Sequence, residues 1–231
     1  MKGISFPPLL TGLAVAGDPF DAAIAAAEEV DPGSVFYGPD EATLRAAVLL
    51  APEKPLAEAI SVVFTAALGM NDAIGALGPP EVALHFEWPG RFRVNGAQCG
   101  EMRAVASTSS PDVEPDWLVV GVEVPVVGAL SENPGEMPDR TTLHAEGCGD
   151  ISVPDLIEAW ARHMMNWLHI YLTDGFAPLH AEWRSRAYKL GEAVEAPVPG
   201  TFIGLDEWGG MILKDGETTR ILPLTQVLEN R

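Results

Sequence analysis

Three arginines lie close together in the middle of a strongly acidic chain, and side chains of this type could bind an acidic group. Arg91, Arg93 and Arg103 are three of only 14 basic residues among 231, against 33 acidic residues and a net charge of −19. A guanidinium group is planar and carries five N–H donors, so clustered arginines suit a carboxylate or a phosphate. The alternative is that the three side chains point into solvent from half-exposed strands. The sequence leaves both interpretations open.

An acidic residue lies beside this cluster and could neutralise part of it. Glu87 precedes the tripeptide Trp-Pro-Gly and stands four residues before Arg91. Side chains alternate along a strand, so Glu87 and Arg91 share a face only if the intervening turn keeps the register. In that case they can form an ion pair, which is worth little at a protein surface.

Other chemistry-bearing residues show no familiar pattern. The five histidines are not paired at metal-ligand spacing, and no Ser-His-Asp order, phosphate loop or dinucleotide fingerprint is present. The two cysteines, Cys99 and Cys148, provide neither a disulfide framework nor a metal-ligand set. We therefore predict no metal site, and a cytoplasmic protein with free thiols.

The residues that could do chemistry lie in a stretch, 84–126, that predicts adjacent antiparallel strands. Asn95-Gly96 between two extended runs is a strong hairpin signal, because both turn positions tolerate positive φ. We expect this meander to form the centre of the sheet. Its predicted strands are 84–87, 91–94, a strand continuing from the Asn-Gly turn to Ala106, and 117–124.

Local signals place helices on both sides of this meander. Asp18-Pro19 is a helix cap followed by a first-turn proline, and Ser152 with Pro154 repeats the pattern. Apolar residues at helical spacing predict a buried helix that follows Lys54-Pro55 and ends at about Leu77. The Pro- and Gly-rich segment 128–149 predicts an exposed loop. The remaining expected elements are strands at 9–16, 34–37 and 42–50, and helices from 19 to before 31, 152–174 and 176 to about 189.

This order of elements predicts an α+β fold in two domains. Residues 1–190 should form a mostly antiparallel sheet with helices chiefly on one side, and residues 191–231 a small β-barrel. The acidic charge makes nucleic acid and anionic membrane surfaces improbable partners. No apolar run reaches the ~18 residues of a membrane span, and Pro7-Pro8 interrupt the short apolar run at the N-terminus.

The central stretch resembles the core of biotin protein ligases, in the biotin/lipoate protein ligase superfamily. That family reads roughly K-W-P-N-D, strand, N-G-x-K-[VI]-[AG]-G-[IL], then G-I-G-I-N-V. The positions that match are Trp88, Pro89, Asn95, Gly96, Gly100 and Gly121. The later segment from Leu172 to Val194 and the glycines near Trp208 resemble the close of the ligase domain and its SH3-like barrel. The resemblance implies a class II synthetase-like fold over most of residues 9–231.

The charged and polar positions of the family pattern are changed in this chain. Glu87 stands where the family has a lysine, Gly90-Arg91 replace Asn-Asp, and Gln98 replaces the second lysine. Other changes put Glu101 and Glu123 at glycine positions and Pro125 at the final asparagine. In the family the first lysine bonds the acid and the phosphate, so Glu87 reverses the charge at that position. The resemblance thus implies a ligase scaffold with an altered site.

A glycine- and arginine-rich loop of the family, G-R-G-R-x-G-R, is also missing. In biotin ligases it closes over the acyl-adenylate, whereas here Gly38-Pro39-Asp40-Glu41 is short and acidic, with Arg45 as its nearest basic residue. A loop of this length cannot form the same lid, so we expect no ordered lid between Tyr37 and Leu44 and a more open cleft than in a working ligase.

Two function classes follow from the resemblance. The chain is either a non-catalytic relative that keeps a cleft for a small carboxylic acid or a surface for a carrier protein, or an active ligase or acyltransferase with an altered substrate. ATP, Mg²⁺ and biotin are implied only if the family's activity persists, and a homodimer is one option for its assembly. The catalytic residues are unknown. The candidate binding residues are Trp88, Arg91, Arg93, Asn95, Gly96, Gln98, Gly100, Arg103 and Gly121.

Overall fold

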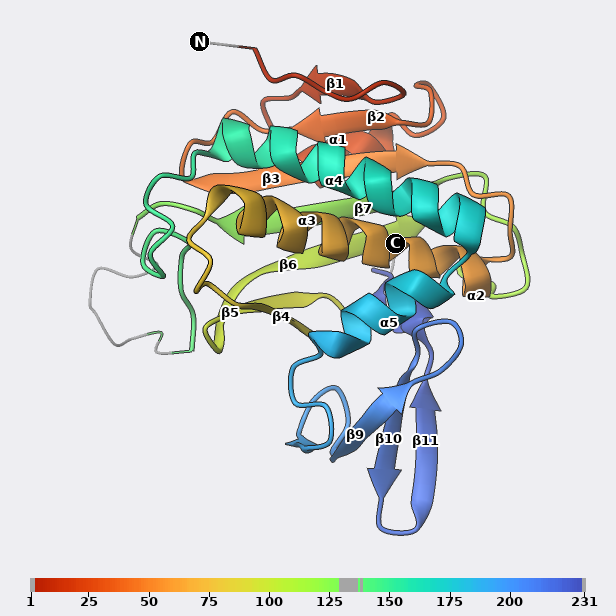
Figure 1. The fold of residues 1–231 in the computed structure, drawn as a ribbon. Helices are drawn as coiled ribbons and strands as arrows, with labels where there is room; N and C mark the ends of the chain where they lie inside the picture. Colours follow the sequence, from red (N-terminus) through yellow and green to blue (C-terminus); the bar gives the residue numbers. More distant parts are fainter. Residues whose placement is uncertain (1–2, 129–136, 138, 230–231) are drawn as a thin grey trace.

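A seven-stranded sheet forms the body of the protein in the computed structural model, which describes residues 3–128, 137 and 139–229 (Figure 1). The strands follow the order β1-β2-β3-β7-β6-β5-β4, and only β1 and β2 pair in parallel among the described strands. This confirms the predicted α+β class with a mostly antiparallel sheet. The strands are β1 (Thr11–Ala14), β2 (Ser34–Tyr37), β3 (Thr43–Leu50), β4 (Leu84–Glu87), β5 (Arg91–Val94), β6 (Ala97–Ala106) and β7 (Leu118–Pro125).

Helices cover one face of this sheet and a single short helix lies against the other (Figure 1). The first set is α2 (Leu56–Ala59), the 3-10 turn η1 (Ile60–Val62), α3 (Val63–Leu77), α4 (Val153–Asp174) and α5 (Ala177–Ser185). Opposite them, α1 (Pro19–Ala25) buries Phe20 and Ala23 against Ala47 and Leu49 of β3. The alternate residues of β3, among them Ala46, pack in the larger core with α3 and α4.

The predicted caps explain where α1 and α4 begin. The Asp18 carboxylate accepts from the amide of Phe20 at 2.8 Å, and the Ser152 hydroxyl accepts from the amide of Asp155 at 3.3 Å. Helix α4 ends at Gly175, whose φ of 80° lies in a region that suits glycine. These local signals were sufficient to predict both starts from the sequence.

The expected helix from 176 to about 189 is too long. Helix α5 ends at Ser185, because the following residues pair with the free edge of β4. The amide of Phe86 donates to the carbonyl of Arg186 at 3.0 Å, and the amide of Tyr188 donates back to Phe86 at 2.7 Å. An unpaired strand edge offers backbone partners that outweigh continued helix.

The segment 128–149 is not simply an exposed loop. Positions 129–136 and 138 lie outside the described residues, but Thr141, Thr142, Leu143 and Cys148 are buried. The amide of Leu143 donates to the carbonyl of Pro125 at 3.1 Å, so this part of the chain continues from the end of β7 into the core.

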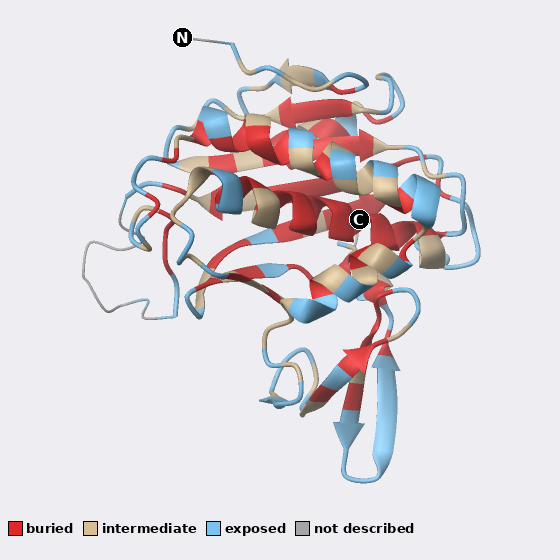
Figure 2. Cartoon of the chain, in the orientation of Figure 1, coloured by how far each residue is buried: buried red, intermediate tan, exposed pale blue. Residues whose placement is uncertain are grey.

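The helical segment Leu56–Leu77 is long and apolar enough to cross a membrane by composition, with a mean hydropathy of 1.5, so the expectation that no such run exists was wrong. Its most apolar window is 72% buried inside the protein. It packs between the sheet and α4, and we interpret it as a core helix (Figure 2).

The C-terminal residues form a second, four-stranded antiparallel sheet in the order β11-β10-β9-β8, compatible with a small barrel. Its elements are β8 (Ala193–Val194), β9 (Gly200–Leu205), β10 (Met211–Asp215), β11 (Thr218–Leu222) and the 3-10 turn η2 (Leu224–Val227). The indole Nε1 of Trp88 donates to the carbonyl of Gly209 at 2.9 Å and joins this sheet to the larger one. The boundary at residue 190 remains a prediction.

Candidate functional site

A row of charged side chains crosses the face of the large sheet that α1 only partly covers. Cross-strand pairing places Arg45 opposite Glu123, Glu123 opposite Glu101, Glu101 opposite Arg91, and Arg91 opposite Glu87. These five residues, from β3, β7, β6, β5 and β4, are called the charged row below. Directly opposite side chains lie about 4.5–5.5 Å apart at Cβ, so neighbours in the row interact.

At one end of the charged row, Arg45 is bonded to two acids. Its Nε and Nη2 donate to Glu123 at 3.2 and 3.3 Å, and its Nη1 donates to Asp40 at 3.0 Å. The bond to Glu123 is the first cause of a raised pKa for Arg45. The amides of Ala42 and Thr43 and the Arg45 guanidinium in turn lower the pKa of Asp40. The short loop between β2 and β3 is thereby tied down beside the sheet.

At the other end, the Trp-Pro-Gly turn keeps the register, so Glu87 and Arg91 do face each other. Their contact is long, at 3.5 Å, and the stronger partner of Glu87 is Arg93, whose Nε donates to it at 2.6 Å. The Arg93 guanidinium also stacks over the Tyr188 ring at 4.8 Å and donates to the carbonyl of Gly96 at 3.1 Å. Arg93 is therefore occupied by contacts within the protein.

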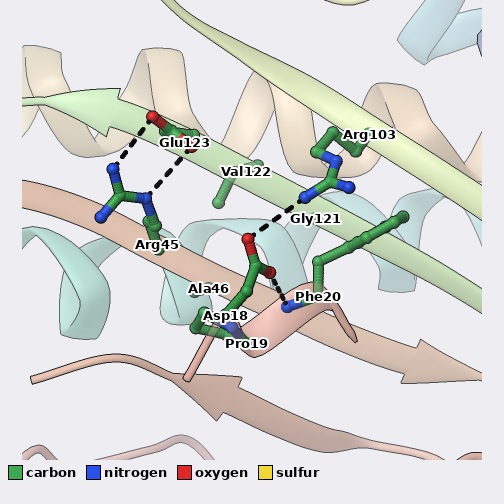
Figure 3. Close-up of a pocket in the computed structure, with 9 residues that line it drawn as sticks. All are labelled: Asp18, Pro19, Phe20, Arg45, Ala46, Arg103, Gly121, Val122 and Glu123. Carbon is green, nitrogen blue, oxygen red and sulfur yellow. Dashed lines mark hydrogen bonds and ion pairs between the residues drawn. The ribbon is translucent and has the colours of Figure 1, made fainter. Parts of the chain in front are cut away.

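The next row of the same face carries Arg103 opposite Gly121 (Figure 3). The Phe20 ring lies in the space that a side chain at Gly121 would fill, since a Cβ there would be 2.5 Å from the ring. The Arg103 guanidinium lies 4.2 Å from the centre of that ring and 3.3 Å from the Asp18 carboxylate. Gly121 thus serves the close approach of α1.

Arg103 has its strongest contacts with the end of the chain. Its Nε and Nη2 donate to the two oxygens of Glu229 at 2.6 and 3.0 Å, a bidentate pair. This bond is the first cause of a raised pKa for Arg103. The cavity between Arg45 and Arg103, called the Arg103 cavity, has a volume of only about 10 Å³, enough for a single water (Figure 3). The expected open cleft is therefore filled here by α1 and Glu229.

A larger hollow lies beside the Trp-Pro-Gly turn, with a volume of about 230 Å³. Trp88, Arg91 and Glu101 line it on the side of the large sheet, and Pro197 and Val227 on the side of the C-terminal residues. We call it the Trp88 cleft. The Arg91 side chain is 48% exposed and its contact with Glu87 is long, which makes Arg91 the most available cation of the three predicted arginines.

The remaining predicted residues have structural contacts. Trp88 is 4% exposed and bonded to Gly209, so its indole nitrogen joins the two sheets. Asn95 bonds Glu146 at 2.8 Å at the end of the β5–β6 hairpin. Gly100 has a φ of 118° and lies too close to the backbone of Glu123 for a side chain.

Gly96 and Gln98 complete the account of the hairpin end. Gly96 has a φ of 92°, as the predicted turn requires. The backbone of Gln98 pairs with the segment after β7, accepting from the amide of Thr141 at 2.9 Å and donating to Asp139 at 2.8 Å. Of the predicted set, the structure therefore brings only Trp88 and Arg91 to one cleft and Arg103 and Gly121 to one cavity.

The residues on this face do not fit Mg²⁺ and ATP. Arg45 and Arg103 are already paired with carboxylates, and three of the five members of the charged row are acids. Within the part of the chain that the structure describes, no group of three or more His, Cys, Asp or Glu could hold a metal ion. We derive no chemical step through either group.

Sequence reasoning missed the contributions of Phe20, Asp18 and Glu229. Asp18 was identified as a helix cap, and it is one, but its second carboxylate oxygen faces Arg103. Glu229 lies 126 residues from Arg103 along the chain, and no spacing rule connects them.

Comparison with known proteins gives a consistent family. A family model described as the biotin/lipoate A/B protein ligase family matches residues 6–185, and a domain of unknown function matches residues 190–230. A biotin--[acetyl-CoA-carboxylase] ligase of Paracoccus denitrificans is 28% identical over 188 residues, which are 78% of this chain and 77% of that protein.

Solved structures agree with this result. A biotin protein ligase-like protein of unknown function from Silicibacter sp. TM1040 is 48% identical, with a TM-score of 0.92, and the match covers 99% of this chain and 100% of that one. The biotin protein ligase of Aquifex aeolicus in complex with biotin has a TM-score of 0.74 at 18% identity, over 93% and 96% of the two chains. At that identity the likeness shows the fold alone.

Proposed function

The chain belongs to the biotin/lipoate A/B protein ligase family, and on that premise we propose that it acts by binding a small acid and does not adenylate biotin. Adenylation builds negative charge on phosphorus and needs cations and donors that are already aimed at it. A binding role needs only a cleft with one available donor group.

One observation carries this proposal: Glu87, at the position of the family's lysine, is bonded to Arg93 at 2.6 Å. Both side chains are mostly shielded, at 21% and 17% exposure, so the pair is part of the packed structure. A phosphate in place of the Arg93 guanidinium would face a carboxylate in a partly desolvated position, which costs several kcal/mol.

The other cations of this face support the same conclusion. Arg45 is bonded to Asp40 and Glu123, and Arg103 to Glu229 and Asp18. To serve a triphosphate, each would first have to leave a carboxylate partner. If each missing cation removes about 2–4 kcal/mol of transition-state stabilisation, the absence of three reduces the rate of adenylation by more than about 10⁵-fold.

The Trp88 cleft is the binding place that this proposal favours. Its volume of about 230 Å³ suits a small molecule, and the half-exposed Arg91 guanidinium supplies a donor for a carboxylate. The acids Glu87 and Glu101 on its wall disfavour ligands with several negative charges.

A second candidate is a ligase or acyltransferase that uses another substrate. Its support is Arg91 itself, a cation at the position where the family has the acid of Asn-Asp, with 48% of its side chain exposed. In that case Arg91 would stabilise charge on a substrate other than biotin, and Arg91→Gln would abolish turnover.

We assign the protein to the cytoplasm, because its two cysteines are both buried and unpaired as thiols. The net charge of −19 argues against nucleic acid and anionic membranes as partners. A carrier protein and a second copy of the chain remain options for its protein partners.

The test is a trapping assay for the activated acid. The protein is incubated with biotin, Mg²⁺, ATP and hydroxylamine, next to an active biotin ligase, and biotinyl hydroxamate is measured by mass spectrometry. We expect none above the reaction without enzyme. Calorimetric titration of small monocarboxylates should show binding that Arg91→Gln weakens; hydroxamate formation would contradict the proposal.

A further inference from the structure

The last residues of the chain make contacts that reach both hollows of the candidate site. Gln226 and Val227 line the Trp88 cleft, and Glu229 bonds Arg103, which lines the Arg103 cavity. We call residues 226–229 the C-terminal tail. Its position on the ligand-facing side of the sheet is what connects a terminal segment to the site.

The tail is attached to the sheet by few bonds. Strand β5 ends before it reaches the second half of β6, and the amide of Glu229 donates to the carbonyl of Ala104 there at 2.9 Å. Leu228 forms a single isolated bridge with the same residue. Beyond this one attachment, the tail is held by the side chain of Glu229 on Arg103.

The Arg103 guanidinium lies among more acids than it can neutralise. Glu229 takes its bidentate edge, Asp18 lies 3.3 Å away and Asp21 lies 4.0 Å away. One positive charge thus faces three negative charges. Exchange of Glu229 for another single carboxylate keeps this balance, whereas a dianion adds a charge opposite Asp18 and Asp21.

We propose that the C-terminal tail is a displaceable occupant of the site, in which the Glu229 carboxylate holds Arg103 until an external monocarboxylate replaces it. This inference rests on the proposed binding role of this face. Because Asp18 caps α1 and also contacts Arg103, release of Glu229 also loosens α1 over Gly121.

The competition has a measurable size. Arg103 is available to an external acid only in the fraction of molecules whose tail is released, so the apparent affinity falls by that fraction. A hydrogen-bonded charge pair of this kind shifts such an equilibrium by about tenfold to a hundredfold. Removal of the Glu229 carboxylate should raise the affinity for a monocarboxylate by that factor.

The experiment compares full-length Glu229→Ala with wild type by calorimetric titration of pentanoate. Glu217→Ala, in the exposed turn between β10 and β11, is the control that removes the same charge from the C-terminal sheet. We expect Glu229→Ala to bind pentanoate at least about tenfold more tightly than either. The double variant Glu229→Ala with Arg103→Gln should lose the gain, and inorganic phosphate should bind more weakly than pentanoate.

Hydrogen exchange on the same samples gives a readout that needs no ligand. The amides of α1 should exchange faster in Glu229→Ala than in Glu217→Ala. Equal pentanoate affinity in wild type and Glu229→Ala would overturn the tail inference and leave the binding role standing. Absence of binding in every variant would contradict both. Tighter binding of phosphate than of pentanoate would overturn the choice of a monocarboxylate.

Discussion

Replacing Glu87 with lysine restores the residue that the biotin ligases have at this position, yet we expect it to damage the protein and to restore no activity. The substitution removes a carboxylate that accepts from Arg93 at 2.6 Å and puts a second cation beside Arg93 and Arg91. Breaking such a shielded pair costs about 3–5 kcal/mol, because a charge is left without its partner. Glu87→Gln should cost less, about 1–2 kcal/mol, since the amide oxygen still accepts a hydrogen bond.

The measurement is the free energy of unfolding in urea, followed by tryptophan fluorescence at pH 7. Glu207→Lys, a charge reversal at an exposed turn residue, is the matched control and should change stability by less than about 0.5 kcal/mol. Pyrophosphate exchange is measured on each variant. If Glu87→Lys is as stable as Glu207→Lys, the pair with Arg93 is unimportant, and if it also gains exchange activity, the argument from Glu87 is refuted.

Three further results are expected. Trp88→Phe leaves the buried carbonyl of Gly209 without its donor and should lower the free energy of unfolding in urea by about 1–3 kcal/mol; an unchanged value would show that the indole does not join the two sheets. Gly121→Ala places a Cβ 2.5 Å from the Phe20 ring and should cost about 1–3 kcal/mol, seen as a lower midpoint of thermal unfolding. Burial raises the pKa of Cys99 from 9.0 to about 12. The unfolded thiol therefore ionises first, and wild type should lose more stability than Cys99→Ala between those pH values; parallel losses would contradict this.

Local signals predicted much of the fold because they act within a few residues. The Asn95-Gly96 turn fixed the β5–β6 hairpin, and β5 has the bounds that the pattern indicated. The caps at Asp18 and Ser152 were equally reliable. Prediction failed at α5, whose last turns give way to pairing with β4, since a free strand edge distant in sequence cannot be seen in a helical pattern.

The candidate site was only partly predictable, for the same reason. The clustering of Arg91, Arg93 and Arg103 in the sequence was visible, but each points to a different partner in the fold. Arg93 is held by Glu87 and Tyr188. Arg103 is held from the far end of the chain. Register, which decides the opposition of Glu87 and Arg91, depended on a turn that the sequence left open.

Biotin-dependent exchange of labelled pyrophosphate into ATP is the measurement that tests the central claim most directly. It reports adenylation alone and needs no carrier protein. With Glu87 bonded to Arg93, and Arg45 and Arg103 bonded to carboxylates, we expect the unmodified protein to show no exchange above the rate without biotin. Exchange at a rate comparable to that of an active biotin ligase would contradict the account, and would make Arg91 the first residue to examine as the replacement cation.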